Sequence, residues 1–304
     1  MNEITGKIKW KKERVILTLL AVPFVIFVFA FSYVPLFGWV LAFLQYKPGL
    51  KIWNCDFIGL SNFKLIFEDW RMSAVIKNTL AMSFLGILCS PLPAVFAIFL
   101  SELKAVRFSK IVQTITTIPN FVSWIIIYAL SYALFSSEGV VNHILLNLGI
   151  VEKATNVLGN AKAVWFFQTA LGVWKSLGWN AIIYFAAIAG IDSELYDAAS
   201  VDGAGRFRRI LHITVPGISS TFFVLLLLQI SNMLSSGIDQ YLTFYNSMVA
   251  DKITVLDLYV YRLGLVTQDY SYATAVGIFK TVIGIALLFG ANGLSKKVRG
   301  ESLV

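Results

Sequence analysis

The sequence has 304 residues, of which 58% are hydrophobic and only 14% are charged. A soluble domain of this length could not hide so much apolar surface, so the composition indicates a membrane protein. The formal net charge of +8 could suggest nucleic-acid binding, but the distribution of the basic residues described below argues against that class. The two cysteines, Cys55 and Cys89, form no CxxC pair and predict neither a metal site nor a disulfide framework.

Six apolar windows approach the roughly 20 residues that a helix needs to cross a bilayer. In chain order they are 15–34, 80–100, 118–135, 164–191, 217–234 and 273–290. The stretch 35–44 is also apolar, and it either extends the first helix beyond a proline kink or forms a second short helix. The sequence therefore predicts an all-α, polytopic membrane protein with about six transmembrane helices.

The basic residues divide unequally between the two sides that these windows define. With both termini on one side, fourteen Lys and Arg residues fall there in short segments, and nine fall opposite in longer loops. Because Lys and Arg accumulate in short cytoplasmic loops, both termini are predicted to lie on the cytoplasmic side of a bacterial plasma membrane. The prediction comprises a basic cytoplasmic segment 1–14, a transmembrane domain 15–291, an external loop 35–79, a cytoplasmic loop 192–216 and a cytoplasmic tail 292–304. The first window follows basic residues without a small-residue cleavage site, which indicates an uncleaved anchor.

Polar residues inside the windows are candidates for a solute pathway, because polar groups in a span tend to face a cavity or a neighbouring helix. Tyr184, Asn180 and Lys175 follow one another at spacings of four and five and can loosely share a helix face. The candidates inside the windows are Trp124, Lys175, Trp179, Asn180, Tyr184, Gln229 and Asn232, and Asp239, Gln240 and Tyr241 follow at the outer mouth of the fifth window. Two alternatives stay open: Lys175 can extend to an interface beside an aromatic belt, and Gln229 can bond to another helix. Lys280 has no partner evident from the sequence.

The loop 192–216 reads as two short helices separated by a turn. Asp192 is a good N-cap, Glu194 adds negative charge to the first turn, and Gly203 suits a left-handed helix end. Leu195, Ala198, Ala199 and Asp202 share one face by their spacing. The turn "RFRRILHI" follows, and Pro216 is predicted to open the next span. This loop either docks a partner through its small residues or is an ordinary loop whose arginines follow the positive-inside rule.

Loop 192–216 resembles the EAA loop of binding-protein-dependent ABC importer permeases, E-A-A-x3-G-x9-I-x-L-P. This chain has Asp197-Ala198-Ala199, three residues, Gly203, nine residues, and then Ile213-Thr214-Val215-Pro216. Asp197 replaces the usual Glu, and Val215 replaces Leu. The segments "FIGLSNFKLIF", "FSKIVQTITTIPNFVSWIII" and "VWKSLGWNAIIYFAAIAGID" also resemble the carbohydrate-type permeases, in particular the LplB-like branch.

The resemblance implies a type I ABC importer transmembrane fold, in which the EAA helix inserts into a groove of a cytoplasmic ATPase. The expected ATPase-coupling residues are Asp197, Ala198, Ala199, Asp202, Gly203, Arg206, Ile213 and Pro216. The expected partners are a second homologous permease, two copies of an ABC ATPase, an extracellular solute-binding protein and the lipid bilayer. The expected substrate is an oligosaccharide, including oligomers with uronic acids, whose carboxylates Lys175 could attract.

The chain is not expected to be an enzyme. It contains no G-x4-G-K-[ST] loop, and its two histidines, His143 and His212, lie on opposite predicted sides, so no metal site or catalytic triad is predicted. The expected cofactors, ATP and Mg²⁺, would be bound by the partner ATPase. An ion-coupled carrier would need intramembrane carboxylates, which the six windows essentially lack. A permease for a non-sugar nutrient remains an alternative.

Overall fold

The computed structural model describes residues 12–299, with side chains for all of them except 12–14, 294, 295 and 297–299. Within that range the chain is helical, and its β pairing is limited to one isolated antiparallel bridge between Leu44 and Phe57. The predicted all-α fold is confirmed. Residues 1–11 of the expected basic segment and residues 300–304 of the expected tail lie outside the described residues.

The helices vary widely in length and are interrupted by short π and 3-10 turns. The α-helices are α1 (Lys12–Val28), α2 (Ser61–Glu68), α3 (Trp70–Leu88), α4 (Pro91–Ser101), α5 (Val106–Thr117), α6 (Trp124–Phe135), α7 (Val140–Asn147), α8 (Val164–Ala189), α9 (Ser193–Val201), α10 (Arg206–Arg209), α11 (Val215–Ser231), α12 (Asp239–Phe244), α13 (Ala250–Ile253), α14 (Leu256–Tyr261) and α15 (Tyr270–Arg299). The π turns are η1 (Phe29–Tyr33), η6 (Ile210–Thr214) and η7 (Arg262–Val266). The 3-10 turns are η2 (Val34–Phe43), η3 (Ile52–Asn54), η4 (Ile118–Phe121) and η5 (Val157–Gly159).

Five helical stretches of the described chain are long and apolar enough to cross a membrane. They are Val15–Phe43, Trp70–Ser101, Trp124–Asn147, Arg206–Ser231 and Tyr270–Gly293. α8 has 26 residues, about 39 Å at 1.5 Å per residue, and is therefore long enough as well. Its polar residues, among them Gln168, Lys175 and Asn180, make it less apolar than the other five. Together these six stretches match the predicted number of spans.

The first two spans are longer than the windows predicted for them. The stretch 35–44 extends the first helix, since η2 follows η1 without a gap. The second span begins at Trp70 rather than at residue 80, because the Asp69 carboxylate caps it by accepting the Arg71 N–H at 2.9 Å. The polar residue Asn78 lies just before the predicted window, and its side-chain amide donates to the carbonyls of Asp251 and Thr254. The segment between the first two spans is therefore 44–69, shorter than the predicted 35–79.

The third and fifth windows also began at the wrong residue. The 3-10 turn Ile118–Phe121 interrupts the third, and α6 starts afresh at Trp124 with Ser123 as its N-cap. The fifth span begins at Arg206 and not near Pro216, because the π turn η6 joins α10 to α11 without a break. A π turn next to Pro216 accommodates the missing N–H of proline.

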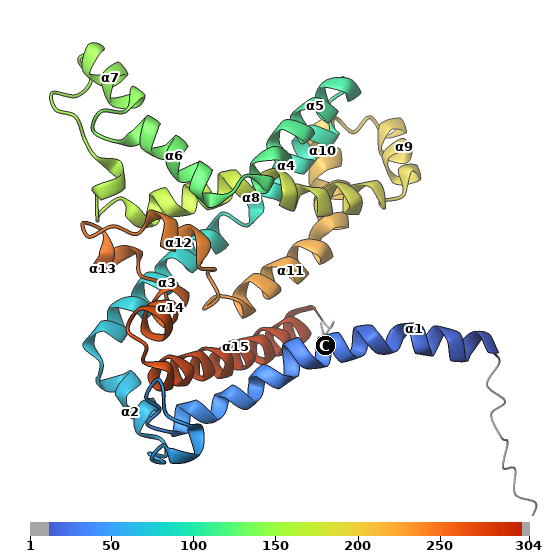
Figure 1. The fold of residues 1–304 in the computed structure, drawn as a ribbon. Helices are drawn as coiled ribbons and strands as arrows, with labels where there is room; N and C mark the ends of the chain where they lie inside the picture. Colours follow the sequence, from blue (N-terminus) through green and yellow to red (C-terminus); the bar gives the residue numbers. More distant parts are fainter. Residues whose placement is uncertain (1–11, 300–304) are drawn as a thin grey trace, which may run out of the picture.

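The elements divide between two ends of the molecule, as Figure 1 shows. α9 and α10 lie at one end, α7 and α13 lie at the opposite end, and α8 runs between the two. α4 packs along α8, and α15 packs against η2 and α11. A buried cluster near the α9–α10 end joins α4, α8, η6 and α11 through Ala94, Ala97, Ile98, Ala181, Tyr184, Ile210 and Ile218.

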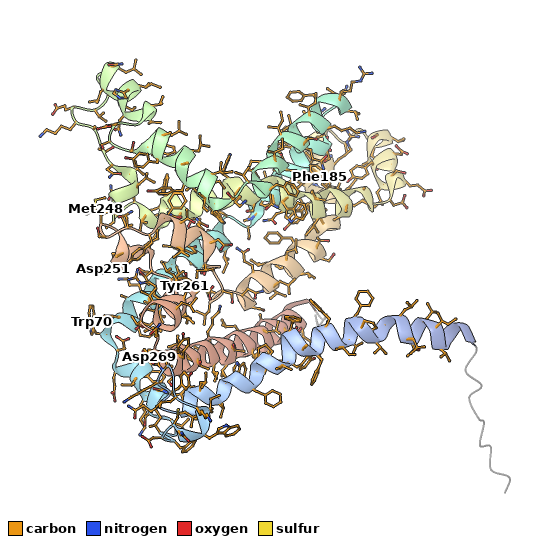
Figure 2. All side chains as sticks on the ribbon, viewed as in Figure 1. Trp70, Phe185, Met248, Asp251, Tyr261 and Asp269 are labelled. Carbon is orange, nitrogen blue, oxygen red and sulfur yellow. The ribbon has the colours of Figure 1, made fainter. Side chains whose placement is uncertain are left out.

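The N-terminal helix extends away from the rest of the chain. All residues from 15 to 40 are exposed, and Figure 2 shows the side chains of α1 projecting around the helix. The chain enters the packed body only at η2, where Ala42 is buried and the Asn62 amide donates to its carbonyl at 2.9 Å. The apolar surface of α1 is therefore left for lipid or for another protein.

An ion pair joins the last span to the segment before it. The Lys280 ammonium group on α15 contacts the Asp257 carboxylate on α14, and their side chains are 22% and 18% exposed. The other Asp257 oxygen accepts the backbone N–H of Gly237 at 3.0 Å. Lys280, which had no partner evident in the sequence, therefore fastens α15 to α14 and to the loop before α12.

Replacing Lys280 with Met is expected to lower the free energy of unfolding by about 3 kcal/mol, because Asp257 would keep a partly buried charge without its partner. The double variant Lys280→Met/Asp257→Asn removes both charges, retains an acceptor for Gly237, and is expected to recover most of the loss. Thermal unfolding in detergent, followed by tryptophan fluorescence, measures both variants. An equal loss in the single and double variants would contradict this account.

Candidate functional site

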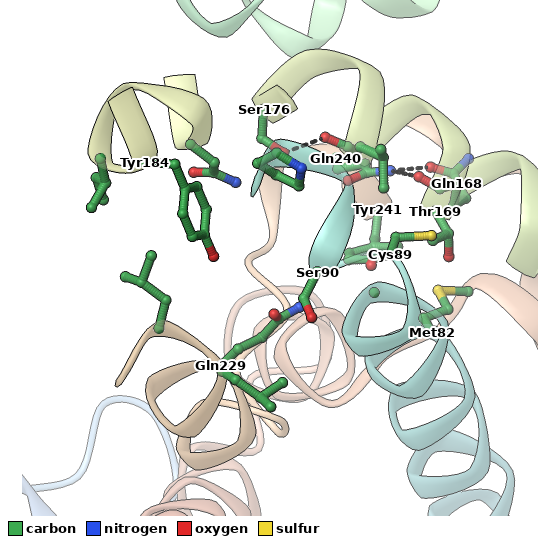
Figure 3. A pocket seen from close by; sticks show the side chains of 18 residues that line it. Met82, Cys89, Ser90, Gln168, Thr169, Ser176, Tyr184, Gln229, Gln240 and Tyr241 are labelled. Atoms are coloured by element: carbon green, nitrogen blue, oxygen red, sulfur yellow. Dashed lines mark hydrogen bonds between the residues drawn. The ribbon is translucent and has the colours of Figure 1, made fainter. Parts of the chain in front are cut away.

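A cavity of about 470 Å³ lies between α3, α4, α8, α11 and α12. Tyr184 on α8 and Gln229 on α11 project into it from different sides, as Figure 3 shows. The lining residues are Met82, Gly86, Cys89, Ser90, Pro93, Gln168, Thr169, Gly172, Val173, Ser176, Asn180, Ile183, Tyr184, Leu225, Leu226, Gln229, Gln240 and Tyr241. Among these residues none is Asp, Glu, Lys, Arg or His, so the wall offers amides, hydroxyls and apolar groups.

α8 contributes a polar stripe to the cavity. Gln168, Gly172, Ser176, Asn180 and Tyr184 follow at strict intervals of four, which places them along one helix face. The predicted set passes from Asn180 to Lys175 at an interval of five, and Lys175 lies on another face of α8. Continuing at intervals of four would have identified Ser176, Gly172 and Gln168, which the candidate set lacked.

A pair of glutamines closes the α12 side of the cavity. The Gln240 amide nitrogen donates to both the backbone carbonyl and the side-chain oxygen of Gln168, each at 2.8 Å. Burial, followed by the nearby Asp257 carboxylate, raises the pKa of Tyr241 to about 12. The Tyr241 phenol therefore stays protonated at neutral pH and can donate a hydrogen bond.

The opposite wall is formed where the second span is interrupted. α3 ends at Leu88 and α4 begins at Pro91, and both residues of the intervening turn, Cys89 and Ser90, line the cavity. The proline pair at 91 and 93, at the start of α4, explains the break, because proline suits the first turn of a helix and cannot continue one. A smaller cavity of about 200 Å³ adjoins the first and shares Gln229 and Tyr241 with it.

The structure brings together six of the ten pathway candidates. Asn180, Tyr184, Gln229, Gln240 and Tyr241 line the larger cavity, and Asn232 lines the smaller one. Trp124, Lys175, Trp179 and Asp239 line neither. The indole of Trp124 packs edge-on against Phe244, and that of Trp179 packs edge-on against Phe121.

Lys175 has a different role from the one considered for it. Its ammonium group donates to three backbone carbonyls at the end of η4, those of Pro119 (3.0 Å), Asn120 (2.8 Å) and Val122 (2.6 Å). It also lies 5.5 Å from the centre of the Trp124 ring. These three acceptors use every donor of the ammonium group. Lys175 therefore holds the interruption between α5 and α6 and leaves no donor for a substrate carboxylate or an interface.

The first half of loop 192–216 has the local structure that its sequence predicts. Asp192 caps α9 by accepting the Glu194 N–H at 2.9 Å, and Gly203 adopts φ +72°, the left-handed conformation. Ala198 and Asp202 are exposed, and Ala199 is partly buried. Five large apolar side chains of this loop are exposed as well: Leu195 (53%), Val201 (88%), Phe207 (71%), Leu211 (62%) and Val215 (40%).

The three arginines of this loop are not equivalent. The Arg206 Nε lies 3.3 Å from a carboxylate oxygen of Glu102, at the end of α4. The Arg209 guanidinium donates to the Ser200 hydroxyl at 2.9 Å, whereas Arg208 is exposed. Arg206 and Arg209 therefore contact the chain itself, whereas no such contact is seen for the Arg208 side chain.

The chain is similar to known transport proteins along nearly its whole length. The family model described as "Binding-protein-dependent transport system inner membrane component" matches residues 94–300. Protein LplB of Bacillus subtilis (strain 168) is 38% identical over 94% of this chain and 90% of its own length. The polygalacturonan/rhamnogalacturonan transport system permease protein YteP of the same strain is 37% identical over 94% and 89%.

The fold is likewise similar to a solved structure. A chain in the crystal structure of a bacterial alginate ABC transporter, in complex with an alginate pentasaccharide-bound periplasmic protein, superposes with a TM-score of 0.86. The two sequences are 32% identical, and the match covers 96% of this chain and 98% of that one.

Replacing Lys175 with Met is expected to lower the thermal midpoint, because the partly buried carbonyls of Asn120 and Val122 would lose their donor, at a cost of about 1 kcal/mol. The matched control is Lys162→Met, which removes an exposed lysine ahead of the same helix and should leave the midpoint unchanged. Thermal unfolding in detergent compares the variants. A normal midpoint for Lys175→Met would contradict the structural role of this side chain.

Proposed function

The chain belongs to the binding-protein-dependent transport system inner membrane components, and from this membership we propose that it is the transmembrane permease subunit of an ATP-driven ABC importer for oligosaccharides. The observation that carries the proposal is the uncharged cavity between the helices of a chain that matches sugar permeases along almost its whole length. As a permease component it is not a catalytic subunit.

The cavity is proposed as part of the route for the sugar. Sugar hydroxyls both donate and accept hydrogen bonds, and the amides of Asn180 and Gln229 do the same. The Tyr184 ring offers an apolar face beside its hydroxyl, which suits the mixed surface of a pyranose ring. The relatives transport polygalacturonan or rhamnogalacturonan in one case and alginate in the other, by their descriptions, which supports an oligosaccharide as the substrate here.

Loop 192–216 is proposed as the coupling loop, the surface on which an ATPase docks. Ala198 and Ala199 let another backbone approach α9 closely, and the exposed Val201 and Phe207 offer apolar area for a partner to cover. Asp197, Asp202 and Gly203 complete the α9 surface, and Ile213 and Pro216 connect it to α11 through η6. The exposed Arg208 side chain can bind the ATPase or lipid headgroups.

The energy is proposed to come from ATP bound with Mg²⁺ in the partner ATPase. ATP can shift this chain between inward- and outward-facing states only through a difference in the affinity of the ATPase for the two states. The proposed assembly contains a second homologous permease, two ATPase copies and an extracellular solute-binding protein. The fourteen-to-nine distribution of basic residues supports an orientation with α9, α10 and both termini in the cytoplasm. α7 and α13, at the other end, then face the binding protein.

The substrate class is tested with the complete transporter in lipid vesicles. Its ATPase activity is expected to rise severalfold with the binding protein and an oligosaccharide, and not with amino acids or inorganic ions. The measurement is phosphate release across a panel of neutral and acidic oligosaccharides, monosaccharides, amino acids and salts. Stimulation by amino acids or ions alone would overturn the sugar assignment, and uptake by the purified chain without an ATPase would overturn the whole proposal.

The coupling role is tested with Gly203→Pro and Ala199→Trp. Proline fixes φ near −65° and cannot adopt the +72° observed at Gly203, and an indole at residue 199 would hold a partner away from α9. Both variants are expected to insert normally and to lose uptake. The control Gly205→Ala has a negative φ and open space around its Cβ, so it should transport normally. Wild-type uptake by both test variants would refute the docking role.

A further inference from the structure

We propose that Glu102 is a positioning residue for transport, because its carboxylate binds Arg206 and makes the coupling loop move together with α4. The inference rests on the coupling role proposed above and adds to it a residue outside the coupling loop. Glu102 follows the last residue of α4, and its backbone N–H bonds back to the Ile98 carbonyl at 3.2 Å. Arg206 is the first residue of α10.

The coupling loop is tied into one unit by its own side chains. The Tyr196 hydroxyl on α9 and the Thr214 hydroxyl on η6 lie 2.9 Å apart, and Thr214 is 1% exposed. Arg209 reaches back from α10 to Ser200 on α9, also at 2.9 Å. α9, α10 and η6 therefore change position together, and a force on α9 reaches Arg206.

The ion pair transfers that displacement to a helix that borders the cavity. The Arg206 Nε and the Glu102 carboxylate oxygen are 3.3 Å apart, and the Glu102 side chain is only 22% exposed. From Ser101 back to Pro91, α4 spans about 16 Å. At the far end of α4 lie Ser90 and Pro93, which line the cavity.

Packing makes α4 a rigid connection between the two sites. Ala97 of α4 and Ala181 of α8 are both fully buried, and the two helices pack closely along their lengths. Small side chains at such an interface let helices approach closely. Because α4 cannot bend freely against α8, a displacement at Glu102 reaches the turn at Cys89 and Ser90.

The pair is exposed enough that its effect on stability should be small, as for most exposed ion pairs. Loss of the ion pair should therefore weaken the coupling of sugar transport to ATP hydrolysis and leave folding unchanged. η6 still joins α10 to α11 when the pair is absent, so α9 would continue to move α11, while α4 would no longer follow. ATP would then be hydrolysed with less sugar transported.

The test compares Glu102→Gln, Arg206→Gln and the charge exchange Glu102→Arg/Arg206→Glu in the complete transporter reconstituted with its binding protein. Uptake of radiolabelled oligosaccharide and phosphate release are measured on the same vesicles, which gives the sugar transported per ATP hydrolysed. Lys104→Gln is the control, because it removes an exposed charge from the same turn without touching the pair. The amount of protein in the vesicles corrects for insertion.

Each single variant is expected to lower the sugar-to-ATP ratio about threefold to tenfold. This change corresponds to a free-energy difference on the order of 1 kcal/mol between coupled and uncoupled ATP hydrolysis. The charge exchange should restore the ratio and Lys104→Gln should leave it unchanged. Normal ratios in both single variants, or an exchange variant as defective as the single ones, would overturn the role of the pair. If Gly203→Pro also transports normally, the coupling role proposed for loop 192–216 is wrong, and not only the role of Glu102.

Discussion

Every polar group within an apolar helix needs a partner, because a lipid environment supplies none. This constraint explains the placement of Lys175 in α8 and of Lys280 in α15. Lys175 is satisfied by three carbonyls of η4, and Lys280 by the Asp257 carboxylate. With both cations occupied inside the protein, the polar groups left to face the cavity are uncharged. If the cavity is the solute route proposed above, a wall of this kind would hold the solute through many weak hydrogen bonds and through no charged group.

Closely packed helices connect the cavity to loop 192–216, the proposed coupling loop. A Cβ on Gly178 of α8 would lie 2.3 Å from the Thr116 carbonyl oxygen, so α5 contacts α8 backbone to backbone at that point. Ala97 and Ala181 allow α4 a similarly close approach on another side of α8. α8 thereby carries the polar stripe on one face and two closely packed helices on others. Because α4 and α5 pack this closely on α8, the three helices are expected to move as one unit.

Much of this fold and of the coupling loop could be predicted from the sequence, because those features depend on local patterns. Apolar length identified the spans, and the caps at Asp192 and Gly203 identified α9. The errors arose where a distant segment satisfies a polar residue. Asn78 hid the start of α3 because its partners are the carbonyls of residues 251 and 254. The acceptors of Lys175 are backbone atoms, which no side-chain pattern reveals, whereas the α8 stripe was present in the sequence at intervals of four.

Two interruptions of the helices lie beside the cavity that is proposed as the solute route. Non-helical backbone at membrane depth is tolerated only where protein or water satisfies its polar groups. The second span is interrupted at Cys89–Ser90, and the chain after α11 is irregular until α12 begins at Asp239. Both interruptions border the two adjoining cavities, which Ser90 lines on one side and Ser235 and Ser236 line on the other. The N–H groups of Cys89, Ser90 and Ser235 bond to carbonyls within their own turns, so these interruptions leave few backbone groups without a partner. Helix ends that meet beside a cavity can move relative to one another without breaking a packed core.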